Sequence, residues 1–259
     1  MQFFQGKESE RERFWQASLQ LSRLISEAGT PVKQAAFLEY AIRCIGRELA
    51  AVTSTAQLYG ENVPQSYDFS IPLIKDDEIQ SQEPMHRTLT DYNVICLPWK
   101  ASKITNAAFE VFTHGFLPEK GFYNVVLYPE IRLAVVINGK HHMAVASTMG
   151  KASARCITIH LTELFPVIQT DGAYWYRDDI GSFEVADYRL ALLYELARKR
   201  EKLNEAEQIE RPTELLPPVF ETPQEELDLL RWLQRRNYTL EQDNRIMSER
   251  LRKLLPNEF

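Results

Sequence analysis

Apolar residues recur at three- and four-residue spacings in the first third of the chain, and this pattern predicts two helices. The first covers residues 8–28 and ends before a glycine, as helices commonly do. The second opens at Thr30-Pro31, a capping residue followed by proline at the first helical position. The helical spacing of apolar residues is lost over residues 60–90, where we expect a long connection with one short strand at residues 69–74.

Short apolar runs alternate with helical patterns from residue 92 to about residue 161. Strands are predicted at 94–97, 123–128, 133–137 and 156–160, and helices at 105–114 and 141–149. The order strand, helix, strand, strand, helix, strand predicts a small mixed α/β domain. An aromatic stretch rich in turn residues follows at 172–183, and then a helix at 185–204.

The last part of the chain predicts a helix behind a proline-containing linker. Large apolar residues and two asparagines recur every seven residues between Leu230 and Leu254, which is the seam of a two-stranded parallel coiled coil. A single helix packed on its own core shows a similar face, so pairing into a homodimer stays open. The predicted organisation is a helical N-terminal region with a connection (1–85), an α/β core with its following helix (86–205), a linker (206–222) and a C-terminal helix (223–259).

Composition narrows the class of protein without naming a function. With 44% hydrophobic and 25% charged residues the chain is globular, and no apolar run reaches membrane-spanning length. The start lacks the pattern of a secretory signal. The three cysteines, Cys44, Cys96 and Cys156, are odd in number and far apart, so we expect no disulfide framework and a cytoplasmic location. The net charge is −6, yet residues 86–165 carry more basic than acidic side chains.

Candidate chemistry concentrates where the apolar strand at 133–137 runs into Asn138-Gly139-Lys140-His141-His142. A glycine there and small residues behind it predict a strand-to-helix turn with a helix N-terminus exposed. Backbone N–H groups and the helix dipole at such a terminus favour an anion, and the lysine and histidines add donors and positive charge. The sequence therefore predicts a phosphate-binding turn.

Plainer interpretations stand beside this one. His141 and His142 also fit a helix N-terminus whose polar groups are satisfied by backbone and water. They form a weak metal site, because adjacent helical residues diverge and no third ligand is local, so the metal is unknown. His160 either points at the same turn or is structural. Lys100 and Lys103, after the first strand of the α/β core, either bind phosphate or form a solvated pair.

The turn and its context resemble the ParB/sulfiredoxin (ParB/Srx) superfamily over residues 92–161. The hallmark of that superfamily is a strand, then Gly-x-x-Arg or Asp-Gly-x-His-Arg, then a helix of small residues, and NGKHHMAVA stands in that place here. Ile95-Cys96-Leu97-Pro98 resembles its opening strand, and the helix closing in His114-Gly115 resembles its next element. The resemblance implies an α+β fold: a ParB/Srx-like mixed-sheet domain with an N-terminal helical layer and a C-terminal helix.

The resemblance also implies a nucleotide site. Asn138, Gly139, Lys140, His141 and His142, with Lys100, would bind ATP or CTP with Mg²⁺, and His141 and His142 would be the catalytic residues. His141 matches the histidine of the superfamily, whereas His142 replaces its usual arginine, which implies weaker or pH-sensitive nucleotide binding. Lys140 stands where sulfiredoxins have their cysteine, which argues against sulfinic-acid reductase activity.

The same resemblance, most of all to plasmid fertility-inhibition proteins of the Osa and FiwA kind, implies a role. The chain would be a nucleotide-binding ATPase or DNase that acts on or near DNA and inhibits conjugative plasmid transfer, with a protein of the conjugation machinery as partner. The alternative is a non-catalytic dimeric module that docks on a protein partner. The residues leave open whether the chain is an enzyme.

Overall fold

The structure is a computed structural model, and it describes residues 7–59, 71, 85–98, 100–117 and 124–207. The chain divides into two compact units, residues 1–209 and 210–259, and all described residues belong to the first. The seam between Leu230 and Leu254 and most of the strand predicted at 69–74 lie outside the described residues. The coiled coil and the homodimer therefore stay predictions.

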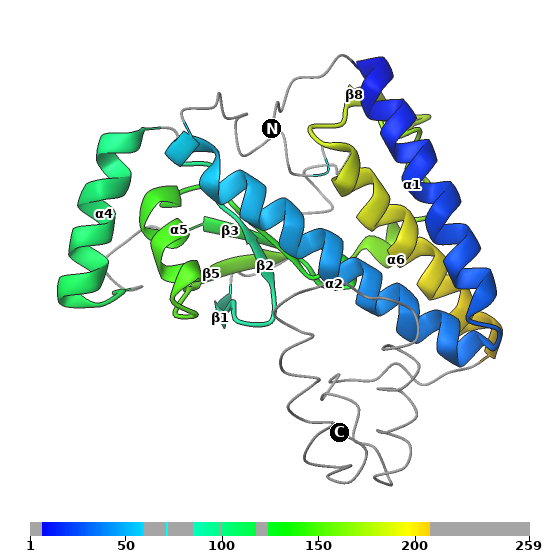
Figure 1. The fold of residues 1–259 in the computed structure, drawn as a ribbon, viewed down its shortest axis with the longest axis horizontal. Coiled ribbons are helices and arrows are strands. Elements are labelled where there is room, and N and C mark those ends of the chain that lie inside the picture. Colours follow the sequence, from blue (N-terminus) through cyan, green and yellow to red (C-terminus); the bar gives the residue numbers. More distant parts are fainter. Residues whose placement is uncertain (1–6, 60–70, 72–84, 99, 118–123, 208–259) are drawn as a thin grey trace, which may run out of the picture. The chain divides into compact units, whose positions relative to one another are not determined.

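Five α-helices occupy the described part of the chain (Figure 1). The two N-terminal helices are confirmed, and Thr30 caps the second by accepting from the backbone N–H of Lys33. The helix predicted from residue 105 starts four residues earlier, at Ala101, after the strand of Ile95 and its following proline. The bounds are α1 Lys7–Glu27, α2 Pro31–Thr55, α4 Ala101–His114, α5 Lys140–Thr148 and α6 Tyr188–Glu207.

The main sheet is mixed and has the strand order β1-β5-β3-β4-β2. Within it, β2 is parallel to β4 and β3 is parallel to β5, while the β3–β4 and β1–β5 pairs are antiparallel. The predicted order of strands and helices in the core is confirmed. The strands are β1 Met85–Thr88, β2 Asn93–Ile95, β3 Asn124–Tyr128, β4 Leu133–Val136 and β5 Ser153–Thr158.

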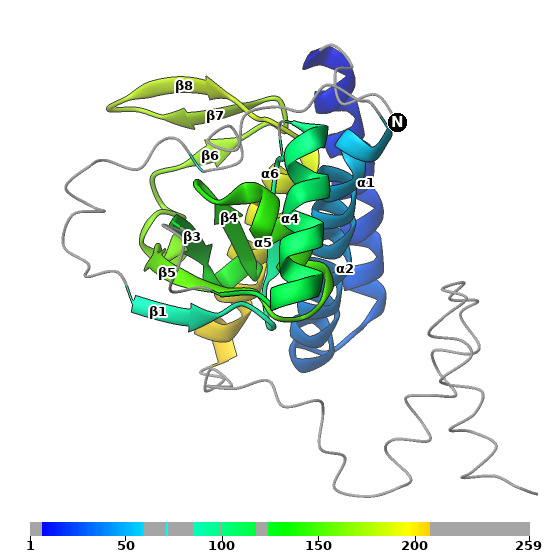
Figure 2. The same ribbon diagram turned by 90° about the vertical axis from the view of Figure 1, so that its left-hand side faces the viewer.

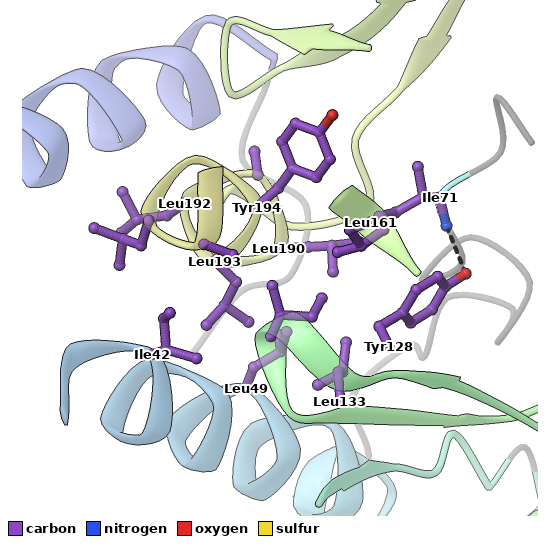
Figure 3. Close-up of a cluster of buried hydrophobic side chains, with 14 of the residues drawn as sticks. Ile42, Leu49, Ile71, Tyr128, Leu133, Leu161, Leu190, Leu192, Leu193 and Tyr194 are labelled. Carbon is purple, nitrogen blue, oxygen red and sulfur yellow. Dashed lines mark hydrogen bonds between the residues drawn. The ribbon is translucent and has the colours of Figure 1, made fainter. Parts of the chain in front are cut away.

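Both faces of the central strands of this sheet are buried under helices. Successive residues of β4 alternate between two cores, since Leu133 and Val135 pack toward α2 and α6 whereas Ala134 and Val136 pack toward α5. The first core is the larger and is shown in Figure 3. A fully apolar strand therefore reflects burial on both sides, as in other sheets covered by helices on two faces.

A second, smaller antiparallel sheet has the order β6-β7-β8 and forms from the aromatic stretch after β5. Its bounds are β6 Gln169–Thr170, β7 Tyr174–Arg177 and β8 Gly181–Glu184. Trp175 of β7 is fully buried and meets the ring of Tyr194 of α6 edge-on at 5.3 Å. Figure 2 shows this sheet apart from the main one, with β7 and β8 forming a hairpin. No helix among the described residues is long and apolar enough to cross a membrane.

Candidate phosphate-binding turn

The predicted turn exists between β4 and α5, and Gly139 makes it possible. Gly139 has φ 80° and ψ 21°, a left-handed conformation that costs other residues about 1–2 kcal/mol, and it is the N-terminal cap of α5. Its backbone N–H donates to Oδ1 of Asn138 at 2.9 Å. Asn138 in turn donates from its backbone to the carbonyl of Asn124, the first residue of β3. The turn is thus held by local hydrogen bonds and by the neighbouring strand.

Two helices begin at this edge of the sheet. Because β2 and β4 are parallel neighbours, their carboxyl ends lie at the same edge, and α4 and α5 follow them. Val145 of α5 packs against Ala107 and Val111 of α4, so the two helices lie side by side (Figures 1 and 2). Lys100 is the N-terminal cap of α4. The structure therefore brings Lys100 to the edge that carries Gly139, as the phosphate interpretation requires.

Positive charge gathers between the two helix N-termini. Burial lowers the pKa of His141, and the charges of Lys103, His142 and Lys140 lower it further. The ring is therefore neutral at pH 7, because even its ordinary pKa of about 6.5 lies below that pH. The charged groups that act on His141 thus come from both helices, Lys103 from α4 and Lys140 and His142 from α5.

His142 has a partner that the sequence did not reveal. Its Nε2 lies 2.7 Å from Oε2 of Glu110, on the neighbouring helix α4. A carboxylate oxygen can only accept a hydrogen bond, so Nε2 of His142 carries the proton in this pair. Nδ1 of the same ring does not take part in the contact. Thirty-two residues separate the partners, and nothing local to Glu110 predicts the contact, which exists only because α4 packs against α5.

Cys96 lies beneath the turn but does not supply a nucleophile. It follows β2 and is fully buried. Burial raises the pKa of its thiol strongly, and the nearby charge of Lys140 opposes this rise without cancelling it. A thiol with a raised pKa is unreactive at neutral pH. Cys96 and Cys156 are both free and buried, so they are core residues.

His160 does not point at the turn. It follows β5, which is parallel to β3 and antiparallel in direction to β4, so it lies at the opposite edge of the sheet from Gly139. There its Nδ1 is 3.1 Å from Oε1 of Glu130, whose Oε2 accepts from the backbone of Leu161. The structural interpretation of His160 is the one that the contacts support.

At that opposite edge, three arginines surround the buried carboxylate of Glu39. Glu39 of α2 pairs with Arg43, with Arg132 just before β4 and with Arg200 of α6. Arg132 has a left-handed backbone conformation, with φ 49°. Burial alone would raise the pKa of Glu39, but the charges of Arg200 and Arg132 hold it below its ordinary value. This network joins two helices to the sheet.

A metal site held by the protein does not fit the described residues. Among them, no group of three or more histidine, cysteine, aspartate or glutamate side chains gathers closely enough to bind an ion. The side chains around the turn are cationic, and Glu110 is occupied by His142. Magnesium therefore stays an expectation from the resemblance, and we assign no step to it.

Comparisons with known proteins give one match. No curated protein and no solved structure matches the chain. The model of one family, described as a family of unknown function, matches residues 1–207, which include the two N-terminal helices, both sheets and α6. This match covers most of the chain, so the protein belongs to the family of unknown function DUF6710.

Proposed function

We propose that the edge formed by the carboxyl ends of β2 and β4 binds the phosphates of a nucleotide. The observation that carries the proposal is that α4 and α5 both begin at the carboxyl ends of neighbouring parallel strands, where Lys103 and Lys140 both act on His141. Helix N-termini present N–H donors and a positive dipole end to an anion, and two of them act on the same ligand here. Gly139 lets the backbone approach a phosphate oxygen.

The chemistry we propose beyond binding is hydrolysis of the bound nucleotide. His141 is neutral at pH 7 because of its lowered pKa, so its ring can accept a proton from an attacking water. Lys103 and Lys140 would stabilise the charge that develops on the phosphate. The resemblance of NGKHHMAVA to the ParB/sulfiredoxin motif supports ATP or CTP as the nucleotide. Action on or near DNA and inhibition of conjugative transfer rest on that resemblance alone.

The histidine that replaces the superfamily's arginine changes what we expect of affinity. His142 is paired with Glu110, so a bound phosphate would compete with this carboxylate for the ring of His142. Because the pKa of His141 is lowered, its ring takes up a proton only at a pH below its ordinary pKa of about 6.5, and a bound phosphate favours that protonated form. Nucleotide affinity should therefore be modest at pH 8 and should rise toward pH 6.

The test is isothermal titration of the full chain with ATP and with CTP, with and without Mg²⁺. Lys103→Gln combined with Lys140→Gln should abolish micromolar binding, whereas Lys33→Gln on the exposed side of α2 should leave it unchanged. Absence of heat at millimolar nucleotide with all three proteins would refute the proposal. The alternative, docking of a non-catalytic dimer on a protein partner, predicts that result and also predicts that His141→Ala loses no function.

A further inference from the structure

Glu110 and His142 form a carboxylate–histidine pair beside the turn at Gly139. Nε2 of His142 lies 2.7 Å from Oε2 of Glu110, and the two side chains are 37% and 59% exposed. His142 is the third residue of α5, so its ring leaves the helix in the first turn, where the backbone N–H groups lack partners within the helix. The pair is therefore open to solvent and lies next to the backbone for which we propose phosphate binding.

This pair contributes little to holding the two helices together. Exposed ion pairs add little to stability, because water competes for both groups. The contact between α4 and α5 is made by apolar side chains, those of Ala107, Val111 and Val145. The pair of His160 with Glu130 is different, because that glutamate is buried and also accepts from a backbone N–H. The exposed pair between α4 and α5 has no comparable part in the fold.

The carboxylate determines which nitrogen of His142 carries a lone pair. Because Oε2 of Glu110 accepts from Nε2, the neutral ring has its lone pair on Nδ1. No hydrogen bond within the described part of the chain uses Nδ1. Nδ1 is bonded to Cγ, so it is also the ring nitrogen nearer to the backbone of α5. The arrangement therefore presents a nitrogen nucleophile close to the first turn of the helix.

We propose that His142 is a nucleophile that takes the γ-phosphoryl group of a bound nucleoside triphosphate, so that hydrolysis passes through a phosphohistidine. This inference rests on the proposed nucleotide site. A covalent intermediate on histidine divides one difficult displacement into two easier ones. Glu110 is a positioning residue, because its carboxylate holds the ring in the reactive tautomer and offsets the positive charge that the ring gains. A phosphate that displaced Glu110 from Nε2 would bind without reacting.

Two displacements at phosphorus make up the reaction. In the first, the lone pair of Nδ1 forms the N–P bond, the bond from the γ-phosphorus to its bridging oxygen breaks, and that electron pair leaves on the nucleoside diphosphate. In the second, a water gives a proton to His141 and attacks the phosphorus, the N–P bond breaks, and its electron pair returns to Nδ1. His141 then passes the proton to solvent, and inorganic phosphate leaves. The charges of Lys103 and Lys140, which act on His141, would stabilise the phosphoryl group in both steps.

The first test is labelling of the full chain with ATP that carries radioactive phosphorus in its γ-phosphate. The reaction is stopped in alkali, because a phosphohistidine survives alkali and breaks down in acid. Wild type should carry the label on His142, located by mass spectrometry of peptides, and His142→Gln should carry none. The matched control is His160→Gln, which removes a carboxylate-paired histidine at the opposite edge and should label like wild type. His141→Ala should accumulate more label, because it lacks the base of the second step.

Variants of Glu110 test its positioning role. Glu110→Gln should lower the rate of ATP turnover by about 10²-fold, whereas its affinity for ATP, measured by titration, should not fall. Glu110→Asp keeps the carboxylate and should recover part of the rate. A fall in affinity with no change in turnover would refute this role, since it would show that Glu110 only shapes the binding site.

The configuration at phosphorus decides the outcome even where the intermediate is too short-lived to isolate. Two displacements retain the configuration of a chiral γ-thiophosphate analogue of ATP, and this result supports the inference. Inversion shows direct attack by water, which overturns the inference and leaves the proposed function standing. Binding of ATP with neither labelling nor turnover also overturns it. Failure of ATP to bind refutes the proposed function, and the inference with it.

Discussion

Glu39 is the residue whose loss should most weaken the fold around the candidate site. Its carboxylate is about one-tenth exposed and is shared by Arg43 of α2, Arg132 just before β4 and Arg200 of α6. Glu39→Gln keeps the shape of the side chain and removes the charge. Three guanidinium groups, themselves 18–35% exposed, would then face one another without a counter-charge.

The magnitude follows from this arrangement. Removing one partner of a buried ion pair costs about 3–5 kcal/mol, and partial exposure of the arginines points to the lower end, ~3 kcal/mol. For a domain of this size that corresponds to a fall in melting temperature of roughly 6–12 °C. Urea unfolding at neutral pH measures the loss. Glu27→Gln is the matched control, since its exposed pair with Arg23 contributes at most about 0.5 kcal/mol.

The pH dependence gives a second check. The pKa of Glu39 is lowered on folding, so its stabilisation is present above its unfolded pKa of about 4.3 and is lost as pH falls through the folded pKa. The difference in stability between wild type and Glu39→Gln should therefore shrink in acid. A loss no greater than that of the Glu27 control, or a difference that stays constant from neutral pH to about pH 3, would refute the reasoning.

Three further substitutions test other parts of the structure. Tyr128→Phe removes a hydroxyl that accepts a buried backbone N–H at 3.2 Å (Figure 3), so urea unfolding should show a loss of about 1–3 kcal/mol. Gly172→Ala should lower the melting temperature more than Gly29→Ala: both have positive φ, but a Cβ on Gly172 would lie 2.2 Å from Phe14. A histidine whose pKa is lowered on folding takes up its proton more readily when the chain is unfolded. His141→Gln should therefore reduce the loss of stability on acidification below about pH 6.5. The same fall in the free energy of unfolding with pH for wild type and variant would contradict this.

The turn at Gly139 was predictable because every signal for it is local. The run Leu133–Val136 is apolar at each position, which indicates a strand covered on both faces. A glycine that needs a left-handed conformation follows, and small residues then allow a helix to pack closely on the sheet. Local pattern and tertiary structure agree here, and the α+β fold class follows from the same reasoning.

Strand β1 could not be found in this way. All four of its residues, Met85 to Thr88, are exposed, so it lacks the alternation that marks a half-buried strand. It exists because its backbone pairs with β5. The contact between Glu110 and His142 could not be predicted for a similar reason. The packing of α4 on α5 creates it, and no spacing along the chain encodes it.

The two edges of the main sheet show why the charge near Gly139 is informative. Each edge receives the carboxyl ends of one parallel strand pair, β2 with β4 or β3 with β5. At the β3–β5 edge, Glu39 neutralises arginines and Glu130 contacts His160, which stabilises the fold. At the β2–β4 edge, burial lowers the pKa of His141, and the charges of Lys103, His142 and Lys140 lower it further. These cations come from two different helices that begin at the same end of the sheet, so the β2–β4 edge, and not the β3–β5 edge, is where we propose that an anion binds.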